Sequence, residues 1–306
     1  MNPIEIENLT HFYGRTEAVH ELNLSVTQGS VCALLGPNGA GKTTTLKVLV
    51  NLLFPKSGCA RVLGVDSRKL GVEQRRQIGY LDESQQMPKW MTVRQLLDYC
   101  RHFYPAWDMA LEAKLLKQFD LPVDRKLQHL SRGVLMKTML VSVLAFRPKL
   151  LLLDEPFSGF DPVVREDVTR GLLEAAQAGE WTVLLSSHDI EEVERLADRI
   201  AMIDEGRLKL SESVEDLLRR FRRVEVDLQD GPALLGNGQV PESWLSLQRA
   251  AGRVCFVESR HNHAQTEAAC RRCFPEAAVK ASPMTLREIY LAMARKEPAA
   301  AEASVT

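Results

Sequence analysis

The chain has 306 residues, of which 45% are hydrophobic and 26% charged, and its 39 basic and 40 acidic residues leave a formal net charge of −1. The length exceeds one average domain, and a charge so near zero gives no reason to expect nucleic acid or an anionic membrane surface as a partner. No window approaches 18 apolar residues, the N-terminus lacks a basic start and six cysteines are scattered along the chain. We therefore expect a reduced, cytosolic protein that is neither exported nor membrane-spanning by itself.

Two segments with alternating polarity open the chain. Apolar and polar residues alternate over residues 4–9 and again over residues 20–26, which predicts two strands. Tyr13 stands between them, at a strand end. An aromatic residue in this place is consistent with ordinary core packing, and its position ahead of the loop described next offers stacking on a purine as the alternative.

A glycine-rich segment, residues 36–43, reads G-x-x-x-x-G-K-T. The short apolar run 31–35 ahead of it is typical of a buried parallel strand, and apolar residues recur with the period of a helix over residues 46–53. Strand, glycine-rich turn and helix form the context in which this motif binds phosphate. The glycines let backbone N–H groups surround the phosphates, Lys42 can reach the β- and γ-phosphates, and the Thr43 hydroxyl can ligate Mg²⁺.

A helical block follows the next strands. Residues 60–65 and 78–81 read as strands, and a polar loop begins after the second of them. Thr92 and Gln95 have the spacing of a capping box and mark a clear helix start. Further helical stretches are expected over residues 110–119 and 131–145. Residues 85–146 are therefore predicted to form a helical subdomain inserted into an α/β domain.

Two carboxylates follow the next buried strand. Residues 150–153 are four leucines, a run that fits a strand buried on both faces and brings Asp154 and Glu155 to the edge where open α/β sheets bind ligands. An aspartate there can hold Mg²⁺ through water, and a glutamate can orient or deprotonate an attacking water. The strand predicted over residues 182–185 brings His188 to the same edge, although a lone histidine at a strand end is also a common structural feature.

The last 85 or so residues form a different pattern. Strands are expected over residues 224–228, 244–247, 254–257 and 278–280, and helices near 264–274 and from Thr285. We expect residues 1–221 to form the main domain, 222–296 a small accessory α+β domain and 297–306 a disordered tail.

Two groups of residues in this region allow more than one interpretation. His261, His263, Cys270 and Cys273 could supply four ligands to zinc, or they could be a loop and a helix with half-buried cysteines. The basic cluster at residues 219–223 could be a solvated linker or a site for lipid or nucleic acid.

These motifs resemble, in order and over residues 3–220, the ATPase subunit of an ABC transporter. In this resemblance Tyr13 takes the adenine-stacking position, residues 36–43 are the Walker A loop, and Asp154 with Glu155 forms Walker B with its catalytic glutamate. Residues 158–161 match the D-loop and His188 matches the switch histidine. The resemblance implies a P-loop NTPase cassette. Residues 103–108 and 283–290 further resemble the ATPases of bacterial antibiotic-resistance and lipid exporters.

The resemblance assigns roles to individual residues. The catalytic residues are expected to be Glu155, His188 and Lys42, and Mg²⁺ is expected to be held by Thr43, Glu83 and Asp154. The residues expected to bind ATP are Tyr13, Gly36, Pro37, Asn38, Gly39, Ala40, Gly41, Lys42, Thr43, Thr44, Ser131 and Gly133.

The sequence departs from the family pattern at two motifs. The signature leucine-serine-glycine-glycine-glutamine reads here Leu-Ser-Arg-Gly-Val over residues 130–134, which keeps Ser131 and Gly133 and removes a polar side chain at Val134. The glutamine of the Q-loop is replaced by Glu83, with Gln85 and Gln86 as nearby alternates. Both departures bear on the rate of hydrolysis more than on ATP binding.

Three functions are compatible with the sequence. In the first, two ATPase subunits, identical or different, sandwich ATP at the inner face of the cell membrane and drive a separate membrane permease, in the manner of an exporter. The alternatives are a non-transport ABC ATPase and a weakly hydrolysing, nucleotide-dependent regulator. The apolar loop around Trp90 is the expected contact for the permease, with stapling of the helix that starts at Thr92 as its other interpretation.

Overall fold

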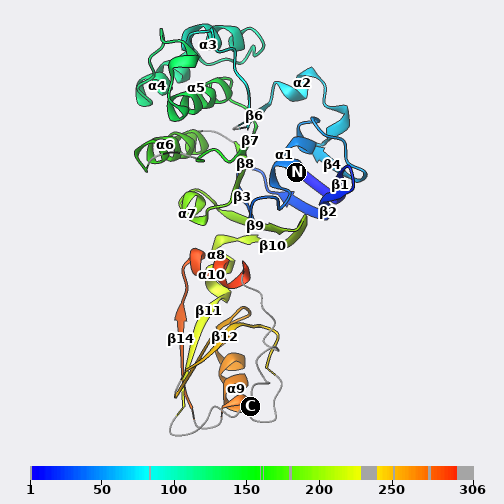
Figure 1. Cartoon of the computed structure of the whole chain (residues 1–306), viewed down its shortest axis with the longest axis vertical. Coiled ribbons are helices and arrows are strands. Elements are labelled where there is room, and N and C mark those ends of the chain that lie inside the picture. The colour runs from blue at the N-terminus through cyan, green and yellow to red at the C-terminus, as the bar shows by residue number, and fades with distance from the viewer. Residues whose placement is uncertain are drawn as a thin grey trace. The chain divides into compact units, whose positions relative to one another are not determined.

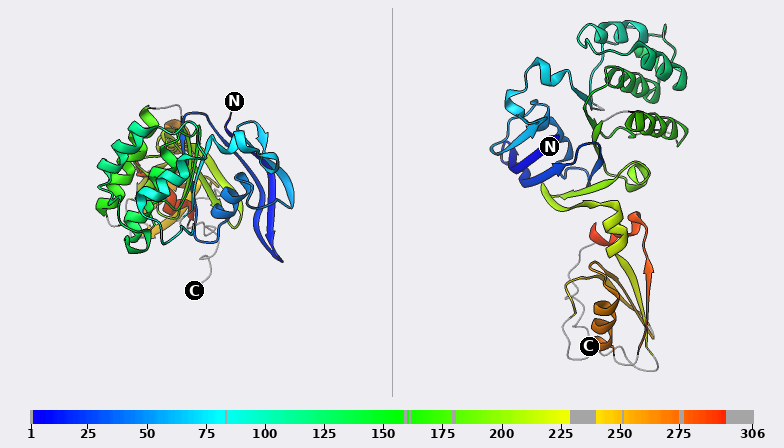
Figure 2. Two further views of the ribbon diagram at one scale, coloured as in Figure 1. Left: turned by 90° about the horizontal axis from the view of Figure 1, so that it is seen from above. Right: turned by 180° about the vertical axis from the view of Figure 1, so that it is seen from behind.

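The computed structural model describes residues 2–82, 84–158, 160, 162–178, 181–228, 240–250, 252–274 and 277–294. The chain divides into two compact units, Met1–Ser211 and Glu212–Thr306, whose elements are labelled in Figure 1 and shown from two further sides in Figure 2. Within the described ranges, no helix is both long and apolar enough to cross a bilayer.

The elements of the larger unit alternate between strands and helices. In chain order they are β1 (Ile4–Tyr13), β2 (Thr16–Val26), β3 (Val31–Leu35), α1 (Lys42–Leu49), β4 (Ser57–Val62), β5 (Val65–Asp66), α2 (Val72–Arg75), β6 (Ile78–Asp82), α3 (Val93–Arg101), α4 (Met109–Gln118), α5 (Arg132–Leu144), β7 (Leu150–Asp154), α6 (Pro162–Ala178), β8 (Thr182–Ser187), α7 (Ile190–Val193), β9 (Arg199–Asp204) and β10 (Arg207–Ser213). Short 3₁₀ turns lie at Ser67–Lys69 and Leu127–His129.

A six-stranded sheet in the order β10-β9-β3-β8-β7-β6 forms the centre of this unit. Strand β3 pairs in parallel with β8 and β9, and β7 pairs in parallel with β6 and β8. Strands β3, β7 and β8 are buried at every position, as expected for parallel strands covered on both faces. Because these strands run in one direction, the residues that follow them meet at one edge of the sheet.

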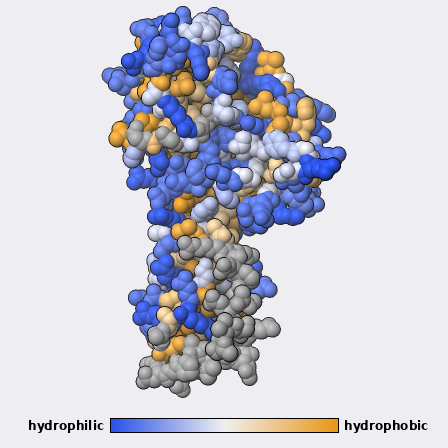
Figure 3. Space-filling view, in the orientation of Figure 1, coloured by the Kyte–Doolittle hydropathy of each residue, from blue (hydrophilic) through white to orange (hydrophobic). Residues whose placement is uncertain are grey.

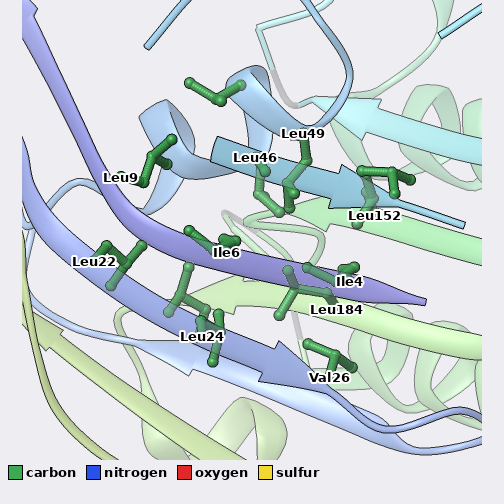
Figure 4. Packing of buried hydrophobic residues seen from close by; sticks show 14 of the residues in the cluster. Ile4, Ile6, Leu9, Leu22, Leu24, Val26, Leu46, Leu49, Leu152 and Leu184 are labelled. Carbon is green, nitrogen blue, oxygen red and sulfur yellow. The ribbon is translucent and has the colours of Figure 1, made fainter. Parts of the chain in front are cut away.

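Helix α1 is held between two sheets. A second sheet, in the order β2-β1-β4-β5, contributes apolar residues to a core cluster that includes Leu46 and Leu49 of α1 and Leu152 and Leu184 of the central sheet. Figure 4 shows these side chains packed between the strands. Burying a leucine side chain contributes about 1.5–3 kcal/mol, so the helix that begins at the phosphate motif is fixed firmly in place.

Helices α3, α4 and α5 form the expected helical block (Figure 1). The capping box is present, because Thr92 Oγ1 accepts a hydrogen bond from Gln95 N at 3.2 Å and Gln95 Oε1 accepts one from Thr92 N at 2.9 Å. Glu112 connects α4 to α3 and to the segment between them. Its carboxylate pairs with Arg101 at 3.0 Å and accepts a hydrogen bond from the Trp107 indole at 2.6 Å. The sequence-based prediction of the α/β cassette with this insertion is confirmed.

The smaller unit is an antiparallel sheet with helices. Its elements are α8 (Val214–Arg220), β11 (Arg222–Asp227), β12 (Trp244–Ala250), β13 (Arg253–Glu258), α9 (His263–Cys273), β14 (Ala278–Pro283) and α10 (Leu286–Ala294), and the strand order is β12-β13-β11-β14. Val224, Val226, Val254 and Phe256 form one buried core with residues of α9. The Trp244 and Phe256 rings stack at 3.9 Å between centroids. The segment 297–306, expected to be disordered, lies outside the described residues.

We expect Phe256→Ala to reduce the free energy of unfolding of the smaller unit by about 3–5 kcal/mol, because the substitution leaves a cavity beside the Trp244 ring. Hydrogen exchange of peptides from β11 and β13 in the full chain measures this loss. Phe103→Ala, at an exposed position of the larger unit, is the control and should leave exchange in β11 and β13 unchanged.

The structure also contains strands that the sequence-based prediction omits. Strand β9 extends the central sheet beside β3, and β10 follows it at the sheet edge. Strands β1 and β2 are longer than predicted, because β1 continues to Tyr13 and β2 begins at Thr16.

The face shown in Figure 3 is mostly hydrophilic, with hydrophobic residues in small groups.

Candidate functional site

The glycine-rich segment forms a tight turn between β3 and α1. A side chain at Gly36 would place its Cβ 2.1 Å from the carbonyl oxygen of Ile203, and one at Gly41 would place it 2.4 Å from that of Ala18. Gly41 also has a φ of 101°, which side chains rarely adopt. The two glycines therefore let the turn pack directly against the backbone at Ile203 and Ala18, and the N-terminus of α1 offers the positive end of its dipole to a phosphate group.

Lys42 lies folded over this turn. It is almost completely buried, and its ammonium group donates to the carbonyl oxygens of Gly36 at 2.8 Å and Pro37 at 3.2 Å. The third partner of the ammonium group is Glu155 Oε1, at 3.2 Å. The structure thus brings together a lysine and a glutamate that are 113 positions apart in sequence.

Asp154 ends strand β7 and is buried. Ser186, in the adjacent strand β8, donates to Asp154 Oδ1 at 2.6 Å, and the Thr43 hydroxyl also bonds to this carboxylate. The pKa of Asp154 is raised, chiefly by burial, against the lowering effect of these two hydrogen bonds; the charges of Asp82 and Glu155 raise it further. The Asp154 carboxylate and the Thr43 hydroxyl are hard oxygen ligands of the kind that Mg²⁺ prefers.

Glu155 has a strained backbone. Its φ is 48°, a left-handed conformation that costs a residue with a side chain about 1–3 kcal/mol. The backbone N–H donates to Ser186 Oγ at 2.9 Å, and Glu155 Oε2 lies 2.8 Å from Nδ1 of His188. His188 is half exposed and follows β8, so the sheet does bring it to the edge that holds Asp154 and Glu155.

Tyr13 lies beside the phosphate turn. Its ring is 50% exposed, and its hydroxyl accepts a hydrogen bond from the Thr44 hydroxyl at 3.4 Å. The ring contacts His11 edge-on, with centroids 4.9 Å apart. Interpretation of Tyr13 as core packing is wrong, since half of the ring is accessible next to α1.

Ser131 and Gly133 lie at the start of α5, in the helical block. Ser131 is exposed and caps the helix by accepting a hydrogen bond from Val134 N at 3.3 Å. A Cβ at Gly133 would lie 3.4 Å from the Val164 side chain of α6. Gly133 thus packs near the start of α6, whereas most of the other nucleotide-binding candidates belong to the turn after β3.

Three of the expected positions belong to segments that the structure does not describe. Glu83, expected at the metal, and Gly159 and Asp161 of the D-loop match lie outside the described residues. The neighbouring Asp82 was not among the candidates, yet it ends β6 in register with Asp154 and is buried. Its position directly after the predicted strand 78–81 is the signal in the sequence, although the polar residues that follow it favour a loop there.

The four possible zinc ligands are not brought together. Cys270 and Cys273 belong to the apolar core of the smaller unit, and burial raises the pKa of the Cys270 thiol to about 12. His261 Nδ1 bonds to Thr266 at 3.1 Å, and His263 is exposed. In the part of the chain that the structure describes, no group of three or more His, Cys, Asp or Glu residues could hold a metal ion.

The basic cluster at residues 219–223 is engaged in local ion pairs. Arg220 pairs with Glu212 at 2.7 Å and lies over the Phe221 ring, and Arg219 pairs with Asp216. Arg223 pairs with Glu288 of α10 at 2.9 Å. These contacts favour the interpretation of the cluster as part of the smaller unit's own surface.

Comparisons with known proteins agree with the geometry. A family model described as ABC transporter matches residues 19–158. The bacitracin transport ATP-binding protein BcrA of Enterococcus faecalis is 30% identical over 231 residues, which are 74% of this chain and 75% of BcrA. The sulfate/thiosulfate import ATP-binding protein CysA of Escherichia coli (strain K12) is 30% identical over 225 residues, 71% of this chain and 61% of CysA. A solved structure of an ATP-binding subunit of an ABC transporter matches with a TM-score of 0.64 and 28% identity, over 71% of this chain and 92% of that one.

Proposed function

Because the chain belongs to the ABC transporter ATP-binding proteins and is thus an ATPase, we propose that it hydrolyses MgATP as a dimer and thereby drives a separate membrane permease. The observation that carries this proposal is the convergence of Lys42, Asp154, Glu155 and His188 at one edge of the central sheet. An ATPase subunit of this kind works on the cytoplasmic face of the membrane, where the permease would hold it.

The residues at this edge suggest a division of roles in hydrolysis. Lys42 and the N-terminus of α1 bind the phosphates, and Glu155 orients an attacking water or accepts its proton. The water oxygen forms a bond to the γ-phosphorus as the bond to the β-γ bridging oxygen breaks, which releases ADP and phosphate. His188 holds the Glu155 carboxylate in place through its Nδ1. Thr43 and Asp154 would hold Mg²⁺, which neutralises charge on the phosphates when bound.

The position of Ser131 and Gly133 at the start of α5 supports a dimer. Both residues lie at the positive end of a 13-residue helix, and their contacts are with α5 itself and the start of α6. We propose that they bind the γ-phosphate of ATP held by the other subunit, so that two ATP molecules lie between two chains. The second subunit could be an identical or a different chain.

The proposed direction of transport is export. Support comes from the similarity to BcrA, a bacitracin transport protein, and from the exporter-like segments at residues 103–108 and 283–290. CysA, an import protein, has the same sequence identity to this chain as BcrA, 30%. The direction must therefore be measured in vesicles.

The proposal is tested by measuring steady-state ATPase activity with and without the membrane protein that co-purifies with the chain. We expect hydrolysis to require Mg²⁺ and the bound permease to change the turnover rate. Hydrolysis that proceeds without any membrane partner, with none recovered after co-expression, would instead indicate a non-transport ATPase.

Trp90 is the proposed contact with the permease. Its side chain is 65% exposed, although the backbone around it is fixed by hydrogen bonds from Leu127 N to Met91 O at 2.8 Å and from Gln128 N to Lys89 O at 3.2 Å. An exposed tryptophan on a fixed backbone is typical of a binding anchor.

Trp90→Ala is therefore expected to leave the basal ATPase rate of the isolated subunit within about twofold, because a surface change away from the phosphates costs little stability. The same variant should lose co-purification with the permease and transport. Phe54→Ala, at a position that is 66% exposed, is the matched control and should retain both. Loss of basal ATPase with intact assembly would show that Trp90 has a role in the fold.

A further inference from the structure

Glu192 is a buried carboxylate on α7, four positions after His188. It is 5% exposed, and both of its oxygens have partners. Oε2 accepts a hydrogen bond from the Ser187 hydroxyl at 2.7 Å, and Oε1 lies 3.3 Å from the Arg165 guanidinium group. The carboxylate therefore joins the end of β8 to helix α6.

Ser187 is the residue through which Glu192 reaches the site. It directly precedes His188 and is completely buried. Its hydroxyl donates to Glu192 and accepts a hydrogen bond from the backbone N–H of Asp189 at 3.0 Å. Its carbonyl oxygen accepts a hydrogen bond from the N–H of Gly36, the first residue of the phosphate motif, at 3.3 Å. Ser187 thus ties the turn that contains His188 both to Glu192 and to the phosphate motif.

The position of this turn determines whether His188 reaches Glu155. The His188 side chain is half exposed, and its Nδ1 lies 2.8 Å from Glu155 Oε2. Because solvent surrounds part of the ring, the direction in which Nδ1 points depends strongly on the backbone that carries it. A displacement of about 1 Å at a reacting group can lower a rate by about 10²-fold. The contacts that fix this turn therefore bear on hydrolysis.

The charge of Glu192 is costly to bury. Burial raises the pKa of Glu192, and the Ser187 hydrogen bond and the Arg165 charge oppose this effect only in part. A buried ion pair adds little stability compared with apolar side chains of similar volume. Buried carboxylates with a raised pKa are, in contrast, frequent at functional sites. These properties favour a role for Glu192 in the site over a role in the stability of the fold.

We propose that Glu192 is a positioning residue for hydrolysis, which holds the turn containing His188 through the hydroxyl of Ser187. This turn keeps the His188 ring in contact with the Glu155 carboxylate. Arg165 supplies the opposite charge that Glu192 needs inside the protein. The inference rests on the proposed function for the role of His188.

A second ion pair between the same parts of the chain provides the matched control. Arg195 follows α7 and lies 3.1 Å from Glu166 of α6. Both of these side chains are more than half exposed. Exposed ion pairs contribute little stability, so Glu166→Ala should hydrolyse ATP at the parental rate. An ion pair that only connects α6 to the region of α7 would behave in this way.

The experiment measures kcat and KM for MgATP in the full chain by phosphate release, with single-turnover hydrolysis of radiolabelled ATP for the slowest variants. We expect Glu192→Ala to lower kcat by about 10–100-fold and to leave KM within about twofold, because the residues of the phosphate motif are unchanged. Circular dichroism confirms that each variant is folded.

A double-mutant cycle with His188→Ala is the decisive measurement. If Glu192 acts through His188, adding Glu192→Ala to His188→Ala should lower kcat by less than about twofold more. Equal losses in the presence and absence of His188, or a parental kcat in Glu192→Ala, would overturn the inference. Ser187→Ala leaves the Glu192 pair with Arg165 in place and should repeat the pattern, so it decides the question if Glu192→Ala does not fold.

The same cycle separates this inference from the proposed function. A His188→Ala variant that hydrolyses ATP at the parental rate would contradict the proposed role of His188, and the inference with it. A slow His188→Ala variant beside a Glu192→Ala variant with the parental kcat would overturn the inference alone.

Discussion

Glu155→Gln is expected to lower the steady-state turnover of ATP by about 10²–10⁴-fold, the contribution typical of a general base. The glutamine amide retains the size of the side chain and its position near His188 and Lys42, but it cannot accept the proton of the attacking water. Affinity for ATP should not fall, because the amide competes for the Lys42 ammonium group less strongly than the carboxylate does. A fluorescent ATP analogue measures affinity, and phosphate release measures turnover.

The same variant should accumulate an ATP-bound dimer that is visible by size-exclusion chromatography. Glu194→Gln, an exposed glutamate after α7, is the control and should hydrolyse ATP at the parental rate. Parental turnover in Glu155→Gln would remove Glu155 from the reaction, and another carboxylate at the sheet edge would have to take its place.

Lys42→Ala should weaken ATP binding itself, by roughly 10–100-fold. Hydrogen bonds to charged groups contribute about 1.5–3 kcal/mol, and 1.4 kcal/mol corresponds to a tenfold change in affinity. The lysine is buried against the phosphate turn, so its removal takes a positive charge away from a site that solvent screens poorly. Calorimetric titration with ATP gives the affinity directly.

Lys69→Ala removes an exposed lysine of the same unit and should bind ATP as the parent does. Circular dichroism of Lys42→Ala serves as a control for correct folding. The substitution removes the Lys42 partner of the Glu155 carboxylate and leaves the His188 contact. Unchanged affinity in a folded Lys42→Ala protein would contradict the assignment of Lys42 to the phosphates.

The sequence predicts the parts of the site that are local. Glycines, lysine and threonine lie within residues 36–43, and the four leucines before Asp154 are enough to place that carboxylate at a sheet edge. Tyr13 remains ambiguous in the sequence, because whether an aromatic ring is buried depends on its neighbours in space. The structure answers this question, because Tyr13 is 50% exposed.

Other features depend on the pairing of strands that are far apart in the chain. The place of Asp82 at the site follows from the register of β6 on β7, which puts it beside Asp154, 72 positions later. Strand β9 contains an apolar run, residues 200–203, of the same kind as the leucines of β7, so the sequence does carry a signal for this strand. The backbone of Glu155 gives no signal at all, since nothing in a glutamate predicts a positive φ.

The strained backbone at Glu155 matters for laboratory evolution of this protein. A glycine at position 155 would adopt a φ of 48° without the steric conflict, so the backbone is strained at the point where the carboxylate is needed. A screen that rewards heat resistance alone does not protect this side chain, and its loss would mean the loss of hydrolysis. Thermostabilised variants should therefore be selected under a simultaneous demand for ATP turnover.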